Sequence, residues 1–518
     1  MEENFSKKDI DQINSHEISL QKIEQQLSFF RSGIAKIIID RPATINDGII
    51  KISDEQAIFY ASFFDKKKQH LKLKKFVPAS GAASRMFKFL SEFLNEFDIE
   101  NETINGYINR KNDNNLSVFL AGMEKFPFFE SINDKLKSNF PDFSSWQSDK
   151  KNLQFIKILL DRNQLDFANK PKGILPFHNY ESSIATPVEE HLKESVSYAS
   201  SNSSAFLHFT ISEEHQQEFE TIINLIKPVI EETSKVKIDI NFSYQNKNTD
   251  TIAVDLDNNP FRDENQNLVF RPGGHGALID NLNTLDADLV FVKNIDNVIQ
   301  NHVEYVAKYK KALAGILLTT QEQVFNYLSQ IEKNQIQEKQ IQEIFDFATQ
   351  KLNVEIIDDF DKYTLENKIQ YLTAILNRPI RVCGMVKNEG EPGGGPFWIV
   401  GQKGKVSLQI IESSQVDLND VSQKNILEAS THFNPVDLVC GLKDYKGQKF
   451  DLAHFINENR GFIVYKTKNG KNLKGYELPG LWNGAMAKWI TVFVEVPLIT
   501  FNPVKTVNDL LKATHQHQ

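Results

Sequence analysis

Residues 73–97 read LKKFVPASGAASRMFKFLSEFLNEF, and this stretch decides the fold class. A short apolar run at 73–79 leads into a turn made only of small residues: Ser80, Gly81, Ala82, Ala83 and Ser84. The residues that follow the turn have helical periodicity. A strand, a tight turn and a helix in this order open a doubly wound fold. The stretch therefore predicts an α/β protein.

Further patterns along the chain extend this prediction. Residues 203–211 predict a strand, 212–232 a helix capped by Ser212, and 235–245 the next strand, which together make a β-α-β unit. Later strand patterns occur at 287–296, 381–386, 396–401, 405–412, 461–466 and 489–496. Helical patterns occur at 17–36, 53–65 and over most of 300–375. We expect a mixed sheet flanked by helices.

These patterns also predict how the chain is divided. Residues 1–70 are expected to form a helical N-terminal extension, and 71–300 the first half of the α/β domain, with a helical insertion at 98–165. Residues 301–378 are rich in Gln, Glu and Lys and predict a second, solvated helical insertion. Residues 379–518 are expected to complete the α/β domain.

Composition restricts the function classes. The 518 residues include 59 Lys and Arg against 68 Asp and Glu, a net charge of −9, which argues against a protein that grips a nucleic-acid backbone. The start of the chain is acidic and lacks an apolar signal core, and no apolar run approaches the ~20 residues of a membrane helix. Two cysteines exclude a disulfide scaffold. We expect a cytoplasmic protein with no membrane or nucleic-acid partner.

The turn at 78–88 is the first candidate site. Its small residues allow backbone N–H groups to approach an anion, the start of the next helix adds a positive dipole end, and Arg85 adds formal charge. The turn lacks both the P-loop pattern and the three spaced glycines of a dinucleotide-binding loop. A plain strand-to-helix turn is an equally good interpretation.

Residues 271–278, RPGGHGAL, form a second glycine-rich candidate. Gly273, Gly274 and Gly276 permit positive φ and a flat backbone wall against a planar ring. His275 stands between glycines, where we expect its side chain to lie outside a close-packed core. The alternative is a flexible turn with an exposed histidine.

Two more candidates follow strand patterns. Asp296 comes after the apolar run 289–292, and ligands of open α/β sheets bind beyond the carboxyl ends of strands. One carboxylate there suits Mg²⁺, which takes one or two carboxylates plus phosphate oxygens and water, although a turn cap is an equal alternative. Lys505 follows Pro503 in a strand-to-helix connection, where a lysine alone is usually a solvated charge.

Taken together and in chain order, these segments resemble the UDP-sugar pyrophosphorylases, or UTP–sugar-1-phosphate uridylyltransferases, of the nucleotide-diphospho-sugar transferase superfamily. The motifs that carry the resemblance are SGAASRM (80–86), PKG (171–173), Gln245 in FSYQNK, PGGHGA (272–277), NIDN (294–297) and VPLITFNPVKTVNDLL (496–511). Weaker matches are Glu412 in LQIIESSQ and Asn434 in HFNPVDLV. The closing motif is the most specific of these. Together the motifs extend from about residue 73 to the C-terminus.

The resemblance implies a GT-A-like, Rossmann-like nucleotidyltransferase that uses Mg²⁺, a nucleoside triphosphate such as UTP and a sugar 1-phosphate. It implies catalytic roles for Arg85, Lys172 and Lys505, and Asp296 as the metal ligand. It implies that the nucleotide is bound by Ser80, Gly81, Ala82, Ala83, Ser84, Gln245, Gly273 and Gly274. It implies that the sugar is bound by His275, Asn297, Glu412 and Asn434.

Departures from the family pattern indicate a divergent, bacterial branch. Ser80 and Ala83 replace loop glycines, and Ala277 replaces an acidic residue. Lys172 lies far downstream of Arg85, so either 98–165 is an insertion or Lys88 has taken over the role of the loop lysine. Two alternatives to an active nucleotidyltransferase remain open. One is a non-catalytic sugar-nucleotide binder of the same fold, and the other is a glycosyltransferase, a class that usually carries an Asp-x-Asp motif.

Overall fold

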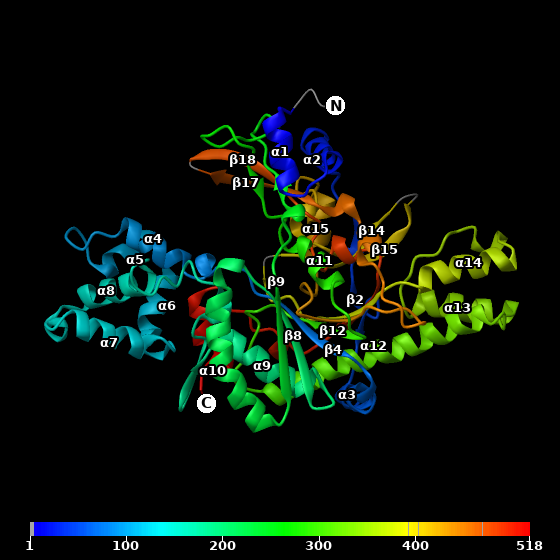
Figure 1. Cartoon of the computed structure of the whole chain (residues 1–518), viewed down its shortest axis with the longest axis horizontal. Helices are drawn as coiled ribbons and strands as arrows, with labels where there is room; N and C mark the ends of the chain where they lie inside the picture. Colours follow the sequence, from blue (N-terminus) through cyan, green and yellow to red (C-terminus); the bar gives the residue numbers. More distant parts are fainter. Residues whose placement is uncertain (1–4, 392, 402–403, 469, 518) are drawn as a thin grey trace. The chain divides into compact units, whose positions relative to one another are not determined.

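The structure is a computed structural model that describes residues 5–391, 393–401, 404–468 and 470–517 (Figure 1). Contacts divide the chain into two compact units. Unit 1 contains Met1–Phe76, Ser243–Val292 and Tyr309–Leu498, and unit 2 contains Val77–Phe242, Lys293–Lys308 and Ile499–Gln518. The units therefore interleave along the chain, whereas the division expected from the sequence runs in consecutive segments.

Unit 1 is built on a mixed sheet, which confirms the predicted α/β fold class. Its strands lie in the order β2 (Thr44–Ile45), β3 (Gly48–Lys51), β19 (Ile490–Glu495), β13 (Ile380–Met385), β16 (Asp437–Gly441), β12 (Leu289–Val292) and β4 (Leu73–Pro78). β16 runs antiparallel to both of its neighbours, and the other adjacent pairs are parallel. Strands buried on both faces carry the apolar runs that the sequence shows.

Alternation along β12 shows how the two faces of this sheet are covered. Val290 and Val292 share a core cluster with Leu278 and Leu282 of α11 (Leu278–Asn283). Phe291, which points to the opposite face, makes an edge-to-face contact with Phe64 of α3 (Asp54–Lys67) at 5.9 Å. Helices therefore flank the sheet on both sides, as predicted.

The helices α12 (Val303–Glu332), α13 (Glu338–Gln350) and α14 (Leu365–Leu376) occupy the segment expected to be a solvated insertion. α12 is not solvated along its length, because Leu313 and Leu317 are buried and a Cβ on Gly384 of β13 would lie 3.0 Å from Leu313. A Cβ on Gly315 would lie 2.0 Å from the carbonyl oxygen of Tyr60, so α12 crosses α3 in backbone contact.

The N-terminal segment is only partly helical, which corrects the expectation for residues 1–70. After α1 (Lys7–Ser15) and α2 (Leu20–Ser32), β1 (Ile39–Pro42) pairs antiparallel with β14 (Gly395–Val400), and β14 pairs with β15 (Val406–Ile411). β3 pairs with β19. The remaining elements of unit 1 are β10 (Thr251–Ile252), β11 (Phe270–Arg271), α15 (Val421–Glu428), β17 (Phe462–Lys468) and β18 (Lys471–Glu477).

Unit 2 is mainly helical. Its helices are α4 (Lys88–Glu96), α5 (Ile104–Lys111), α6 (Asn114–Gly122), α7 (Phe129–Asn139), α8 (Ser148–Leu160), α9 (Pro187–Tyr198) and α10 (Gln216–Ser234). Its strands are β5 (His178–Tyr180), β6 (Ser183–Ala185), β7 (Ser200–Ser201), β8 (Ser204–Thr210) and β9 (Lys237–Ser243). Residues 104–160 are thus helical, as expected for 98–165. α10 begins later than predicted, after a 3₁₀ turn at Glu213–His215, and the Ser212 side chain does not cap it.

An aromatic core holds the helices α4 to α8 together. It contains Phe87, Phe93, Phe119, Phe126, Phe128 and Phe155. Val504, Val507 and Leu510 belong to the same cluster, so the segment that carries Lys505 is anchored by the apolar residues on either side of it.

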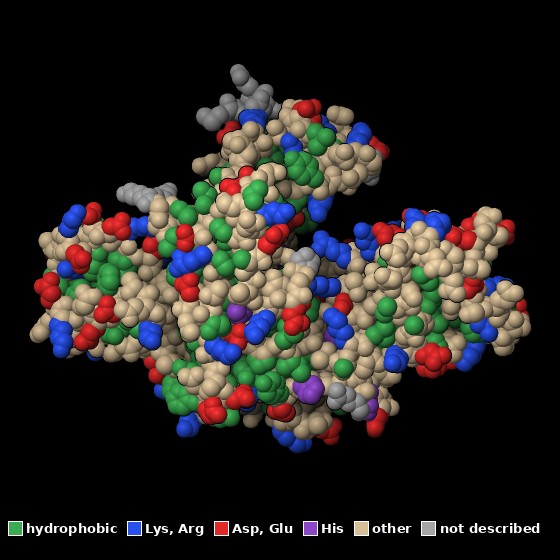
Figure 2. Space-filling view, turned by 180° about the vertical axis from the view of Figure 1, so that it is seen from behind, with side chains coloured by type: hydrophobic (Ala, Val, Ile, Leu, Met, Phe, Trp, Pro, Cys, Tyr) green, Lys and Arg blue, Asp and Glu red, His purple; other side chains and the backbone are tan. Residues whose placement is uncertain are grey.

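None of the helices within the described ranges is long and apolar enough to cross a membrane. On the face drawn in Figure 2, Lys and Arg side chains are interspersed with Asp and Glu.

Candidate functional site

The loop after β4 is anchored on one side and open on the other. Its exposed members are Ser80, Gly81, Ala82, Ser84 and Arg85. Ala83 is buried, and its backbone N–H donates to the carbonyl of Lys170 at 2.9 Å, so that N–H is already engaged. A Cβ on Gly81 would meet no atom within 4 Å, which leaves room for an anion beside the loop.

Lys172 lies directly against this loop despite its distance in the sequence. Its backbone N–H donates to the carbonyl of Gly81 at 3.2 Å, and Pro171 forms a bridge with Ala82. The next residue, Gly173, has no room for a side chain, because a Cβ there would lie 3.0 Å from the ring of Phe219. Lys88, in contrast, is 74% exposed and lies 3.5 Å from Glu92 of its own helix. The geometry favours Lys172 over Lys88 as the lysine of the loop.

The side chain of Lys172 joins two further segments. Its ammonium group donates to Oδ2 of Asp296 at 2.8 Å and to the carbonyl of Val504 at 2.6 Å. The Lys172 and Asp296 side chains are 14% and 20% exposed, so the pair is largely shielded from water but not sealed from it. A pair in such a position keeps much of its electrostatic strength and still meets a ligand that enters from solvent.

Backbone contacts connect the Asp296 loop to the segment that carries Lys505. Val504 donates its backbone N–H to the carbonyl of Asp296 at 3.1 Å, and Asn297 forms a bridge with Pro503. Lys505 is exposed, and its ammonium lies 5.7 Å from the centre of the Phe501 ring. Backbone contacts and the Lys172 side chain therefore bring together parts of the segments 78–88, 294–297 and 502–506 within unit 2, whereas 271–278 belongs to unit 1.

Asn297, expected on the sugar side, supports the loop that precedes Lys505. It is 3% exposed. Its Oδ1 accepts from the backbone N–H of Asn502 at 2.8 Å, and its Nδ2 donates to the carbonyl of Thr500 at 3.3 Å. Both polar ends of this side chain are used inside the protein, so its sugar-binding role stays a prediction.

Buried polar side chains on α9 hold the Asp296 loop in place, and sequence reasoning missed them. Lys293 donates to Glu194 at 2.5 Å, and Glu194 also accepts from the Tyr198 hydroxyl at 2.9 Å. Nε2 of His191 lies 3.2 Å from the carbonyl of Ile295. The signal was a helix, HLKESVSY, whose charged and polar residues fall on a face that the α/β pattern requires to be buried.

A second buried network fixes the segment beyond Lys505. His178 contacts Glu190 at 2.8 Å through Nδ1 and His515 at 2.9 Å through Nε2. Burial, assisted by the neighbouring His178, lowers the pKa of His515 to about 3. Glu190 also accepts from Tyr180, whose pKa burial raises above its ordinary value. The network keeps His515 neutral at ordinary pH.

The residues predicted to read the base lie in unit 1, around Thr249. Nε2 of Gln245 donates to the Thr249 hydroxyl at 3.2 Å. A Cβ on Gly273 would lie 2.4 Å from the Thr249 carbonyl, so Gly273 is required by close backbone packing. Gly274 has φ of 76° and is the glycine of this loop that adopts a left-handed conformation. Gln245 and Gly273 thus both lie against Thr249. The backbone surface that was expected to face a planar ring is partly occupied by the Thr249 carbonyl.

The expectation that His275 lies outside a packed core is wrong. Its ring stacks on Trp482 with centroids 4.8 Å apart, and its Nδ1 accepts from the backbone N–H of Leu481 at 3.0 Å. Burial lowers the pKa of His275 to about 4. Gly276 allows this packing, because a Cβ there would lie 2.2 Å from the carbonyl oxygen of Pro479.

Glu412 and Asn434, which the sequence places 22 residues apart, meet in unit 1. Nδ2 of Asn434 donates to Oε1 of Glu412 at 3.1 Å. Burial raises the pKa of Glu412, and the Asn434 amide opposes part of that rise. Oδ1 of Asn434 is buried without a hydrogen-bond partner among the described residues. A buried carboxylate beside an unpartnered acceptor is suited to binding the hydroxyl groups of a polar ligand.

The chain contains two Asp-x-Asp sequences, at 286–288 and 255–257, and neither is an open metal motif. Asp286 lies 2.5 Å from the ammonium of Lys72, and Asp288 lies 2.8 Å from that of Lys443. Asp255 accepts from the backbone N–H groups of Asp257 and Asn259 in its own turn. These carboxylates are satisfied by the protein, which disfavours the glycosyltransferase alternative.

Asp296 fits an Mg²⁺ ion that arrives with a phosphate. Across the ranges that the structure describes, no cluster of three or more His, Cys, Asp or Glu side chains is arranged to hold a metal. Mg²⁺ is satisfied by one or two carboxylates together with phosphate oxygens and water. The partly exposed Asp296 supplies one such carboxylate, and Lys172 balances its charge when the ion is not there.

Comparisons with known proteins give a family and a set of distant structural similarities. The chain is similar to a variant of UDP-glucose pyrophosphorylase from Leishmania major in complex with UDP-glucose, with 12% identity, a TM-score of 0.43, and 98% of this chain and 79% of that chain covered. It is also similar to UDP-glucose phosphorylase from Trypanosoma brucei, with 12% identity, a TM-score of 0.44 and coverage of 98% and 77%. Such distant similarities say nothing about activity.

The comparison with curated proteins finds no match. A family model described as "Domain of unknown function (DUF4301)" matches residues 6–516, nearly the whole chain. The chain belongs to the DUF4301 family.

Proposed function

We propose that this protein is a nucleotidyltransferase that makes an NDP-sugar, most consistently a UDP-sugar, and pyrophosphate from a nucleoside triphosphate and a sugar 1-phosphate. One observation supports it above the others. The side chain and backbone of Lys172 tie together the loop at Gly81, the carboxylate of Asp296 and the carbonyl of Val504, which precedes Lys505. These are the segments for which the motif resemblance implies phosphate and metal binding.

The electrostatics of this cluster suit two anionic substrates. Arg85, Lys172 and Lys505 supply three positive charges from the segments that meet near Asp296. A second carboxylate, Asp509, accepts from the backbone N–H of Lys505 at 2.9 Å. A triphosphate and a sugar phosphate repel each other in water, and fixed cations in a partly shielded site reduce that repulsion. Arg85 and the exposed loop backbone hold the β- and γ-phosphates, and Lys172 and Lys505 hold the α-phosphate and the sugar phosphate.

The reaction needs little proton transfer. An oxygen of the sugar 1-phosphate attacks the α-phosphorus, the bond from that phosphorus to the bridging oxygen of the β-phosphate breaks, and pyrophosphate leaves with the electron pair. The attacking oxygen is already ionised at neutral pH, so no general base is required. The protein's contribution is positioning, worth about 7–11 kcal/mol in favourable cases, together with preorganised charge.

Asp296 is the residue that holds Mg²⁺ in this proposal. The ion supplies Lewis-acid charge to the phosphate oxygens and a template for their orientation. Lys172 contributes a positive charge next to the same carboxylate. His191 and Lys293 contribute by fixing the loop on which Asp296 lies.

The roles of the unit 1 residues are a separate part of the proposal. Gln245, Gly273 and Gly274 are proposed to read the base, and Glu412, Asn434 and His275 to bind the sugar. The pairing of Gln245 and Gly273 around Thr249 and the Glu412–Asn434 hydrogen bond support these two groupings.

The decisive assay measures pyrophosphate release with Mg²⁺ across nucleoside triphosphates and sugar 1-phosphates. We expect release with at least one pair, and a loss of about 100-fold or more in rate for Asp296→Asn and for Lys505→Ala, the effect of removing one charge-stabilising group. Lys88→Ala, a matched change on an exposed lysine, is expected to keep the rate. Full activity in both site variants, or no release from folded protein with any pair, contradicts the proposal.

One observation favours a second candidate, a non-catalytic sugar-nucleotide binder. The N–H of Ala83 is engaged by Lys170, and Ala83 is buried, so the loop offers fewer donors to a triphosphate than an all-glycine loop. Calorimetry that shows saturable UDP-sugar binding by a protein without turnover identifies this alternative.

A further inference from the structure

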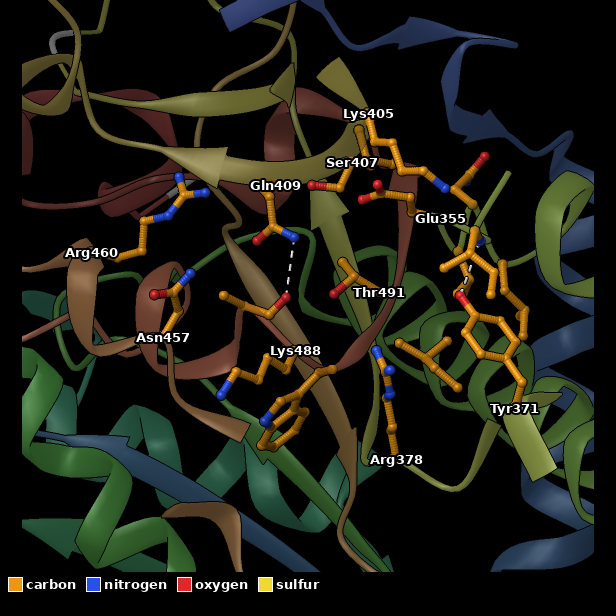
Figure 3. A pocket seen from close by; sticks show the side chains of 18 residues that line it. Glu355, Tyr371, Arg378, Lys405, Ser407, Gln409, Asn457, Arg460, Lys488 and Thr491 are labelled. Carbon is orange, nitrogen blue, oxygen red and sulfur yellow. Dashed lines mark hydrogen bonds between the residues drawn. The ribbon is translucent and has the colours of Figure 1, made fainter. Parts of the chain in front are cut away.

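A cavity in unit 1 is lined by residues that the proposed reaction does not use. Its volume is about 380 Å³, within the range of small-molecule sites. It is formed by residues 352–357, the end of α14, β15, the turn at Asn457 and Arg460, and the segment that leads into β19 (Figure 3). None of the residues expected to bind the nucleotide, the sugar or the metal lines it.

Positive charge dominates the lining. Arg378, Lys405, Arg460 and Lys488 face one carboxylate, Glu355, in a protein whose net charge is −9. Lys405 is engaged by the carbonyl of Ile356 at 2.6 Å and by Asp358 at 3.3 Å. No ion pair joins Arg378, Arg460 or Lys488 to an acid among the residues that the structure describes.

The two arginines are partly buried and lack an anionic partner within the described ranges. Nε of Arg378 donates to the carbonyl of Ala374 at 3.2 Å, so what this side chain lacks is a counter-charge and not every hydrogen bond. Partial burial lowers the pKa of Arg378 and of Arg460 below the ordinary value, because the charged form loses part of its contact with water. Trp489, 5% exposed, lines the same cavity, and its indole N–H has no hydrogen-bond partner among the described residues.

The arginines lie at opposite ends of the cavity. Figure 3 shows Arg460 with Asn457 at one end, Arg378 with Tyr371 at the other, and Gln409, Lys488 and Thr491 between them. Other polar side chains of the lining therefore lie between the two arginines in this view. The apolar side chains of Leu408, Trp489 and Ile490 also line the cavity, so a carbon skeleton is accommodated along with the charges.

We propose that this cavity is a second ligand site, which binds a small organic molecule carrying two separated phosphate groups. One phosphate pairs with Arg460, the other with Arg378, and Lys488 adds charge between them. Arginine suits this role because its planar guanidinium binds phosphate through two parallel hydrogen bonds. The proposal does not depend on the nucleotidyltransferase reaction, because the lining shares no residue with the group formed by Lys172, Asp296, Gly81 and Val504, here called the Lys172 cluster.

The test uses the full chain and two probes, inorganic phosphate and hexane-1,6-diyl bisphosphate, measured by calorimetry at two salt concentrations. We expect the bisphosphate to bind at least about tenfold more tightly than inorganic phosphate, and to weaken as salt rises. Arg378→Gln, Arg460→Gln and Lys488→Gln are each expected to weaken it by about tenfold, the usual effect of losing one charge-assisted contact. Lys488 is exposed, so its variant keeps the fold even if an arginine variant does not.

Two controls separate this site from the proposed reaction. Arg31→Gln removes an exposed arginine of α2 and is expected to leave bisphosphate binding unchanged, as is Lys505→Ala. Absence of saturable bisphosphate binding overturns the proposal, as does binding that Lys488→Gln leaves unchanged. Equal affinities for the two probes overturn the two-phosphate assignment, and a loss of binding in Lys505→Ala assigns the probe to the Lys172 cluster instead.

Discussion

The pair formed by Lys172 and Asp296 allows a quantitative test of how the Lys172 cluster is held together. The perturbation is a double-mutant cycle with Lys172→Met, Asp296→Asn and the combined variant. Lys172→Met leaves a carboxylate that is only 20% exposed without its cation, and it leaves the Val504 carbonyl without its donor. Asp296→Asn removes the charge but keeps an oxygen that can accept from Lys172.

The structure sets the expected size of each effect. Breaking a largely buried pair from one side costs about 3–5 kcal/mol, so Lys172→Met is expected to lower the free energy of unfolding by about 3 kcal/mol. Asp296→Asn is expected to cost about 1–2 kcal/mol, because a neutral hydrogen bond replaces a charge-assisted one. The double variant has no unpaired carboxylate and is expected to be about 1.5–2 kcal/mol more stable than the sum of the two single losses.

The assay is urea unfolding followed by intrinsic fluorescence and circular dichroism, with Lys512→Met as a matched control. Lys512 is 58% exposed and pairs with Asp509 at 2.8 Å, so its loss is expected to cost less than about 1 kcal/mol. A coupling energy below about 0.5 kcal/mol, the limit within which independent sites add, refutes the reasoning. In that case the pair is a geometric coincidence, and the convergence of the three segments rests on their backbone contacts alone.

Other predictions concern pH. Burial raises the pKa of Glu412 above its ordinary 4.5, so the stability from its protonated form is lost as pH rises through the raised value. Glu412→Gln is therefore expected to gain stability relative to the parent as pH rises from 4 to 7, and to raise the KM for a sugar 1-phosphate. A pH-independent difference in melting temperature contradicts this. The folded pKa of His515, about 3, lies below its ordinary 6.5, so stability is expected to fall as pH drops from 6.5 toward 3, by up to about 1.4 kcal/mol per pH unit. His515→Gln is expected to flatten this acid limb in urea unfolding, and an unchanged slope places the titration elsewhere.

The parts of the fold that depend on local pattern could be predicted from the sequence. The strand–turn–helix at 73–97 and the apolar run that became β12 were read correctly, because alternating or continuous apolar residues reflect burial in a sheet. The strands at 39–51 were missed, since two- to four-residue pairings depend on partners such as β19 and β14 that lie hundreds of residues away. The charged and Gln-rich composition of 301–378 predicts a solvated helix, because composition alone does not reveal that Leu313 and Leu317 of α12 are buried.

The features of the candidate site could likewise be predicted only in part. Motif order singled out Lys172, Asp296 and Lys505 one by one, but nothing local reveals that Lys172 contacts Gly81 across the helices α5 to α8. The packing of His275 on Trp482 could not be predicted, because flanking glycines indicate freedom of the backbone and not the position of a neighbouring ring. The arginine-lined cavity draws on segments between 352 and 491, and each of its cations taken singly resembles an ordinary surface charge.

The interleaving of unit 2 has a consequence for how it is assembled. Gly81, Asp296 and Lys505 come from three stretches of chain, Val77–Phe242, Lys293–Lys308 and Ile499–Gln518, with unit 1 inserted twice. Contacts of such long sequence separation form late in folding, because loop closure must precede them. The Lys172 cluster is thus expected to form only after the stretch that carries Val504 and Lys505 has joined the other two. A fragment covering 77–242 alone gains it only by complementation in trans with the two missing stretches.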